Sequence, residues 1–92
     1  MANVRYWFGS WVSAEGNDLQ PGDAHSWIAW PINYGEALSI TASPVQGGVE
    51  YVLAVQDVAI QSDPNGRRIF FTVRNVGQNA VPGYGIGYSF VS

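Results

Sequence analysis

Glycine and proline recur at such short intervals in this sequence that no uninterrupted helical pattern of useful length remains. Proline lacks the backbone N–H that a helix interior needs, and glycine loses more conformational entropy there than any other residue. The interruptions fall at Gly16, Pro21-Gly22, Pro31, Gly35, Pro44, Gly47-Gly48, Pro64-Asn65-Gly66, Gly77 and Pro82-Gly83. Because the segments between them are rich in β-branched and aromatic residues, we expect a chain made of β-strands.

Six segments between these interruptions have the residue pattern of strands. In segment 37–43, Leu38, Ile40 and Ala42 alternate with serine and threonine, which predicts a strand with one buried face. In segment 4–13, apolar residues occupy both alternating sets, which predicts a strand that is covered on both sides. The other expected strands are segments 24–32, 49–61, 69–74 and 84–91.

Local signals specify how some of these strands begin, bend and end. Asp63-Pro64-Asn65-Gly66 is a strong turn signal, so the segments on either side of it are expected to form a hairpin. The apolar parity of segment 49–61 changes near Gln56-Asp57, which indicates a β-bulge or a change of sheet. Pro31 cannot donate to a ladder, so segment 24–32 ends or lies at a sheet edge there.

The two ends of the chain carry similar segments. Residues 6–13 (YWFGSWVS) and 84–92 (YGIGYSFVS) both place aromatic residues around glycine and finish in Val-Ser. Either two core strands of similar environment drew similar residues, or the two strands are paired or placed equivalently across the fold.

Composition limits the class of protein. A chain of 92 residues is long enough for one hydrophobic core, and 47% hydrophobic with 12% charged residues excludes the composition of a disordered chain. The sequence has no cysteine, which removes disulfides, zinc fingers, iron–sulfur ligation and thiol catalysis together. The sequence therefore predicts an all-β fold, a small antiparallel β-sandwich of about six to seven strands in one domain over residues 1–92.

Charge and hydropathy also restrict the partners. The net charge is −3 and the only cationic side chains are four arginines, so neutralisation of nucleic acid phosphates is not expected. No apolar run approaches the about 18 residues that span a bilayer, so no membrane span is expected. The N-terminal residues show no signal peptide, and localisation stays open, with an extracellular role still compatible with the sequence.

The sequence lacks a recognisable catalytic set. His25 is the only histidine, no Gly-x-Ser-x-Gly nucleophile motif precedes a helix, and the seven acidic residues are scattered without an obvious pair. Asp18 and Asp23 could join His25 at a metal, but turn residues around Pro21-Gly22 are the better interpretation. We therefore expect a protein that is not an enzyme and that has no metal or cofactor.

The tryptophans are the most informative feature for function. Four of them cannot easily all be buried in a core this small, so at least one is expected to be exposed, where it can stack on a sugar ring or anchor a protein interface. Tryptophan as filler of the core is the structural alternative. The candidate ligand-binding residues are Trp7, Trp11 and Trp27, with Asn17, Asp18 and His25 as hydrogen-bonding groups. The sequence thus favours a non-catalytic, lectin-like carbohydrate-binding module. A self-assembling or protein-interaction module is the alternative. The expected partners are a glycan or protein ligand and further copies of the chain.

A set of short motifs resembles a known family. Segment 53–60 (LAVQDVAI), the turn after it, segment 69–77 with its Asn-x-Gly ending, and segment 84–91 resemble the opening half of CARDB-type domains, which are bacterial immunoglobulin-like modules of cell-adhesion character. Leu19-Gln20-Pro21-Gly22, the strand through Trp27 and Trp30, and segment 38–42 are similar to the closing half of that family, so the order of the halves is permuted. The resemblance implies an immunoglobulin-like sandwich and a role in adhesion or binding.

Overall fold

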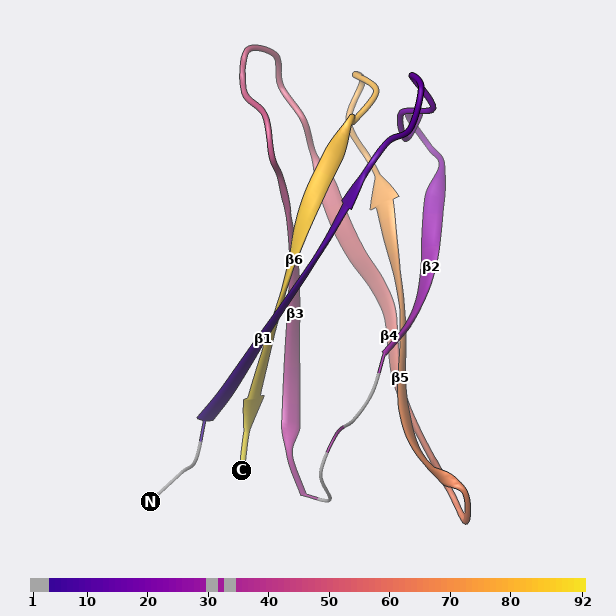
Figure 1. Ribbon diagram of the computed structural model, residues 1–92, viewed down its shortest axis with the longest axis vertical. Helices are drawn as coiled ribbons and strands as arrows, with labels where there is room; N and C mark the ends of the chain where they lie inside the picture. Colours follow the sequence, from indigo (N-terminus) through magenta and orange to yellow (C-terminus); the bar gives the residue numbers. More distant parts are fainter. Residues whose placement is uncertain (1–3, 30–31, 33–34) are drawn as a thin grey trace.

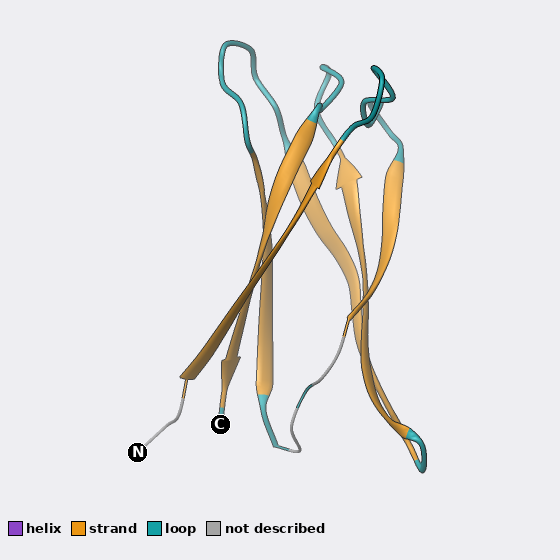
Figure 2. Cartoon of the chain, viewed as in Figure 1, coloured by secondary structure: helices purple, strands orange, loops and turns teal. Residues whose placement is uncertain are grey.

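The computed structural model describes residues 4–29, 32 and 35–92, and its regular structure consists of strands (Figures 1 and 2). The strands in chain order are β1 (Val4–Val12), β2 (Ala24–Ala29), β3 (Ala37–Pro44), β4 (Leu53–Asp63), β5 (Gly66–Asn75) and β6 (Gly83–Val91). In the described part of the chain there is no helix, and so none that is long and apolar enough to cross a membrane. The prediction of an all-β chain is confirmed.

The strands form two antiparallel sheets of three strands each, in the orders β1-β6-β3 and β2-β5-β4. Every connection crosses from one sheet to the other except the β4–β5 hairpin, and Figure 1 shows the first sheet on the left and the second on the right. The two similar end segments of the sequence are neighbours, because β1 pairs with β6 along its whole length. The central strands β5 and β6 therefore organise the molecule.

The core lies between the two sheets and is supplied mainly by alternate residues of the two central strands. Phe71 of β5 meets Tyr88 of β6 edge to face, with ring centroids 5.8 Å apart. In β3, Leu38, Ile40 and Ala42 pack against this core as their alternation predicts. The buried hydrophobic residues are Leu19, Ile32, Ile69, Phe71, Val73, Val81, Tyr84, Ile86, Tyr88 and Phe90.

The predicted hairpin and bulge are both present in the second sheet. Asp63 pairs with Gly66 across a two-residue turn, and the N–H of Asn65 donates to Oδ1 of Asp63 at 2.8 Å. The register shifts between Gln56 and Ala59, where Asp57 adopts a φ of 55°. Since β4 stays paired with β5 on both sides of the shift, the parity change marks a bulge and not a change of sheet. The strand begins at Leu53, four residues later than the sequence pattern suggests.

The expectation that the first strand is covered on both sides is wrong. Residues 4–10 of β1 are exposed on both faces, and only Trp11 is half-buried. The reason is tertiary: β1 lies at the edge of a narrow sheet, and its lower end in Figure 1 swings away from β2 of the facing sheet. β2, the second expected strand, also lies at an edge and ends at Ala29; Pro31 falls outside the described residues.

A buried asparagine fixes the loops at the upper end of the two sheets. Asn75 is fully buried, and its Nδ2 donates to the carbonyls of Leu19 at 2.9 Å and Asn79 at 2.8 Å. Its Oδ1 accepts from the N–H of Gly77 at 3.0 Å, which explains the Asn-x-Gly step of the sequence. Leu19 in turn pairs with Val81, so the β1–β2 and β5–β6 loops are joined.

Candidate binding site

Three of the six residues selected from the sequence come together around the hydroxyl of Tyr84. Trp11 meets His25 edge to face with ring centroids 4.4 Å apart, and the ring centroid of Trp27 lies 6.1 Å from that of His25. Nε1 of Trp27 donates to the Tyr84 hydroxyl at 2.8 Å, and Nδ1 of His25 lies 2.7 Å from the same oxygen. Tyr84 itself is fully buried, so this cluster joins the edges of the two sheets at their upper end.

The hydrogen bonds define the charge state of the cluster. An indole N–H can only donate, so the Tyr84 oxygen accepts from Trp27, and its own hydrogen is available for Nδ1 of His25. Burial lowers the pKa of His25, partly opposed by the charge of Asp23. Burial also raises the pKa of Tyr84 to about 12, although the hydrogen bond from Trp27 acts in the opposite direction. The cluster is therefore neutral near pH 7 and has the character of a satisfied structural network.

The other three selected residues lie apart from this cluster. Trp7 contacts Tyr88 with ring centroids 5.7 Å apart and is 47% exposed. Asn17 is exposed in the β1–β2 loop, and Asp18 beside it accepts a hydrogen bond from Oγ of Ser13 at 2.6 Å. Among the described residues, no group of three or more His, Cys, Asp or Glu side chains could hold a metal ion.

Two hollows flank β1, one on each face of the strand. The inner hollow has a volume of about 410 Å³ and opens between the edges of the two sheets. It is lined by Trp7, Phe8, Gly9, Ile28, Ala29 and Tyr88, which carry no ionic charge. Gly9 faces it without a side chain, and a Cβ there would be 3.9 Å from Cε2 of Tyr88.

The outer groove, of about 260 Å³, lies on the solvent face of the β1-β6-β3 sheet. Strand register arranges this face in three rows, each running from β1 across β6 to β3: Tyr6, Ser89 and Ser39; Phe8, Gly87 and Thr41; Ser10, Gly85 and Ser43. The groove itself is lined by Phe8, Gly9, Thr41, Ser43, Gly85, Ile86 and Gly87. One wall is thus aromatic, the floor is glycine backbone and the other wall carries hydroxyl groups.

The chemistry of the outer groove suits a neutral polar ligand. Phe8 is 77% exposed, and Thr41 and Ser43 are exposed as well. Within the described chain, the hydroxyls of these three rows make no side-chain hydrogen bond, so they are available to a ligand. A Cβ on Gly85 would meet nothing nearer than 3.9 Å, which shows how open the floor is.

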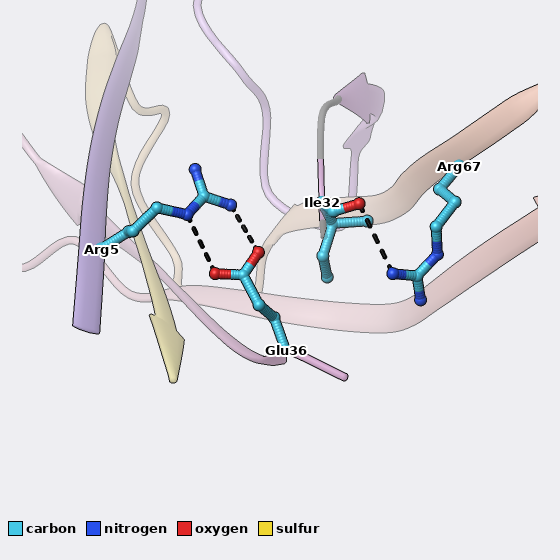
Figure 3. A network of polar contacts seen from close by, with 4 residues as sticks. All are labelled: Arg5, Ile32, Glu36 and Arg67. Atoms are coloured by element: carbon cyan, nitrogen blue, oxygen red, sulfur yellow. Dashed lines mark hydrogen bonds and ion pairs between the residues drawn. The ribbon is translucent and has the colours of Figure 1, made fainter. Parts of the chain in front are cut away.

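An ion pair anchors the start of β1 on the inner side of its sheet, because Arg5 belongs to the alternate set of residues that faces away from the outer groove. Nε and Nη2 of Arg5 donate to the two carboxylate oxygens of Glu36 at 2.9 and 2.5 Å, as Figure 3 shows. The guanidinium group of Arg5 also lies over the ring of Phe90, 4.5 Å from its centroid. A second contact in Figure 3, from Nη1 of Arg67 to the carbonyl of Ile32 at 3.5 Å, joins the chain before β3 to the second sheet.

Sequence reasoning missed the outer groove, although a signal for it was present. Small and hydroxyl residues alternate with apolar residues in both β3 and β6. The alternation indicates a solvent face for each strand, but only the β3–β6 pairing places the two hydroxyl and glycine sets side by side. Comparisons of the chain with protein-family models, with curated proteins and with solved structures gave no match.

Proposed function

We propose that this domain is a non-catalytic carbohydrate-binding module that holds a neutral glycan in the outer groove. The observation that carries the proposal is the row Phe8, Gly87 and Thr41, with Ser43 in the next row. An aromatic ring packs against the apolar C–H face of a sugar, while hydroxyl groups exchange hydrogen bonds with the sugar hydroxyls. The glycine floor lets the ring of the sugar approach the backbone.

The absence of ionic charge from this face favours a neutral glycan over an acidic one. The fourteen residues that the three strands direct to this side include no Asp, Glu, Lys, Arg or His: Val4, Tyr6, Phe8, Ser10, Val12, Ala37, Ser39, Thr41, Ser43, Gly83, Gly85, Gly87, Ser89 and Val91. A uronic acid or a sulfated sugar would lose its hydration here without gaining a cationic partner. We therefore place the ligand among neutral hexose or N-acetylhexosamine polymers.

The order of the strands supports an immunoglobulin-like interpretation of the sandwich. The sheet β2-β5-β4 corresponds to the B-E-D order of an immunoglobulin domain, and β3-β6-β1 corresponds to C-F-G. In this interpretation the first strand of the chain takes the place of the last strand, G. Such an exchange of ends accords with the permuted order of the CARDB-like motifs, and an adhesion role accords with glycan binding.

Isothermal titration of the purified chain against neutral glucan, mannan, galactan and chitin oligosaccharides tests the proposal. We expect at least one of these series to bind, and Gly85→Val to abolish that binding because the new side chain fills the groove. Thr41→Val removes one hydroxyl at nearly constant volume, and the loss of one hydrogen bond of about 0.5–1.5 kcal/mol weakens affinity by roughly 2- to 12-fold.

Thr72→Val is the matched control, because Thr72 lies on the solvent face of the other sheet, opposite Ser26 and Gln56. This variant should bind like the unmodified chain. Circular dichroism of all variants verifies that they are folded. The proposal is refuted if no series binds, or if Gly85→Val binds as well as Thr72→Val.

A further inference from the structure

The outer edge of β1 is a complete, unoccupied hydrogen-bonding ladder within the part of the chain that the structure describes. The N–H of Ser13 donates to the carbonyl of Pro82 at 2.9 Å, and this bond sets the alternation along the β1–β6 pair. The odd-numbered residues of β1 therefore bond to β6. The even-numbered residues point their N–H and C=O groups away from the sheet: Val4, Tyr6, Phe8, Ser10 and Val12.

This edge is self-complementary. Phe8 is the central residue of β1, so an antiparallel pairing of two copies about a twofold axis at Phe8 uses all nine residues. In that register Trp7 of one copy lies opposite Gly9 of the other, and Tyr6 lies opposite Ser10. Trp7 and Tyr6 thus each face a small residue, while Phe8 lies opposite its own copy and Trp11 lies opposite Arg5. Shifting the register by one step in either direction sets Trp7 against Trp7 or Trp11 and leaves two residues of each strand unpaired.

We propose that two copies of this chain pair through β1 and join their β1-β6-β3 sheets into one continuous sheet of six strands. The inner hollow is the receptor for the partner's Trp7. It opens beside Gly9, where β1 presents no side chain, and Ile28, Ala29 and Tyr88 supply an apolar lining. The same pairing covers an aromatic sheet edge of the kind that proteins protect from random association.

The area at the edge and its charge agree with a homodimer. Tyr6 is 68% exposed, Trp7 47% and Phe8 77%. At about 150–250 Å² for a whole aromatic side chain, these three can bury no more than roughly 400 Å² per copy, or about 800 Å² per dimer, because the face of Phe8 that lines the outer groove stays exposed. The paired backbone and Ile28 add to this, which brings the interface toward the about 1,200 Å² of a small stable complex. Arg5 is the only charged residue of β1, and Glu36 neutralises it within its own copy, so like charges do not oppose the approach.

The dimer leaves the proposed glycan groove in place. Both outer grooves lie on the same face of the joined sheet, on either side of the twofold axis, and each keeps its own Thr41 and Ser43. Two weak sites on one rigid sheet bind a polymeric glycan with increased avidity. The dimer itself does not depend on glycan binding.

Disulfide trapping tests the register directly, because the natural chain has no cysteine. Cα atoms in a directly opposed hydrogen-bonded pair are about 5.5 Å apart, within the about 4.4–6.8 Å that a disulfide spans. Phe8→Cys should therefore give a covalent dimer under mild oxidation. Ser10→Cys alone should not, since the two copies of that position lie four residues apart, about 13 Å.

Tyr6→Cys alone should likewise stay monomeric, whereas an equimolar mixture of Tyr6→Cys and Ser10→Cys should cross-link. The same reactions in urea provide the control for random collision. The register is overturned if Ser10→Cys cross-links as fast as Phe8→Cys. It is also overturned if the variants that should cross-link give no more covalent dimer in buffer than in urea.

Sedimentation velocity on two matched glycine variants tests the dimer without cysteine. Gly9→Val fills the inner hollow and should lower the mass to that of a monomer, while Gly85→Val fills the outer groove and should keep the dimer. A built Cβ comes no closer than 3.9 Å to another atom at either position, so both variants should fold, which circular dichroism verifies. A monomeric unmodified chain, or a Gly9→Val dimer as stable as Gly85→Val, contradicts the inference. Loss of glycan binding with retention of the dimer refutes only the proposed function.

Discussion

Removing one oxygen atom from the centre of the aromatic cluster should measurably destabilise the domain. Tyr84→Phe keeps the ring in place but deletes the hydroxyl that accepts from Nε1 of Trp27 and bonds to Nδ1 of His25. Trp27 and His25 are only half-buried, so each ring nitrogen that loses its hydrogen-bond partner should lower the free energy of unfolding by about 1 kcal/mol, at the lower end of the range for unsatisfied polar groups. The expected loss is therefore about 2 kcal/mol, which in a chain of this length lowers Tm by roughly 8–16 °C.

Urea unfolding at pH 7.5, followed by tryptophan fluorescence, measures this loss. Tyr88→Phe is the matched control, because the Tyr88 hydroxyl makes no hydrogen bond in the described part of the chain and its ring also lies in the core. The control should change the free energy of unfolding by less than about 0.5 kcal/mol. If Tyr84→Phe loses no more stability than Tyr88→Phe, water replaces the hydroxyl and the network does not join the two sheets energetically.

Two further predictions concern stability. Asn75→Ala removes three hydrogen bonds of a fully buried side chain and should lower the free energy of unfolding by about 3 kcal/mol in the same urea assay; a loss below 1 kcal/mol would show that the loops it joins hold without it. Burial lowers the pKa of His25 from its ordinary value of 6.5, so below pH 6.5 the unfolded chain binds a proton at this residue more readily than the folded chain does. The contribution of His25 to the free energy of unfolding is therefore fully present above pH 6.5 and falls as the pH drops below that value. Comparing unfolding at pH 7.5 and 5.5 should show this fall in the unmodified chain and a smaller one in His25→Gln; equal falls would exclude His25 as its source.

Local sequence signals were enough to predict much of the secondary structure. The turn at 63–66 and the bulge near Asp57 depend on backbone preferences of a few neighbouring residues, and both are present. The buried face of β3 follows from strict alternation, because side chains of a strand point to opposite faces in turn. Errors in strand ends, such as the late start of β4, arise where apolar residues continue into a loop.

The candidate site could be predicted only in part. An exposed aromatic residue was expected from the surplus of tryptophan, and Trp7 and Phe8 are exposed. Tyr84 was not selected, although it organises Trp11, His25 and Trp27, because nothing in the sequence distinguishes it from the other alternating aromatic residues of β6. Trp7 lies apart from this cluster because it is four residues before Trp11 along β1, and its exposure follows from the divergence of β1 and β2, which no local pattern encodes.

The sequence by itself determined the class of structure: strands instead of helices, a hairpin at Asn65, a bulge near Asp57, and a core built by alternation. Those properties follow from the conformational preferences of residues a few positions apart. Only the tertiary structure decided that β1 lies at an edge with aromatic residues on both faces, and that Phe8, Gly87 and Thr41 form one row. The physical reason is that the row joins strands from the start, the middle and the end of the chain. Backbone hydrogen bonds set the register of these strands, and those bonds do not depend on which side chains the residues carry.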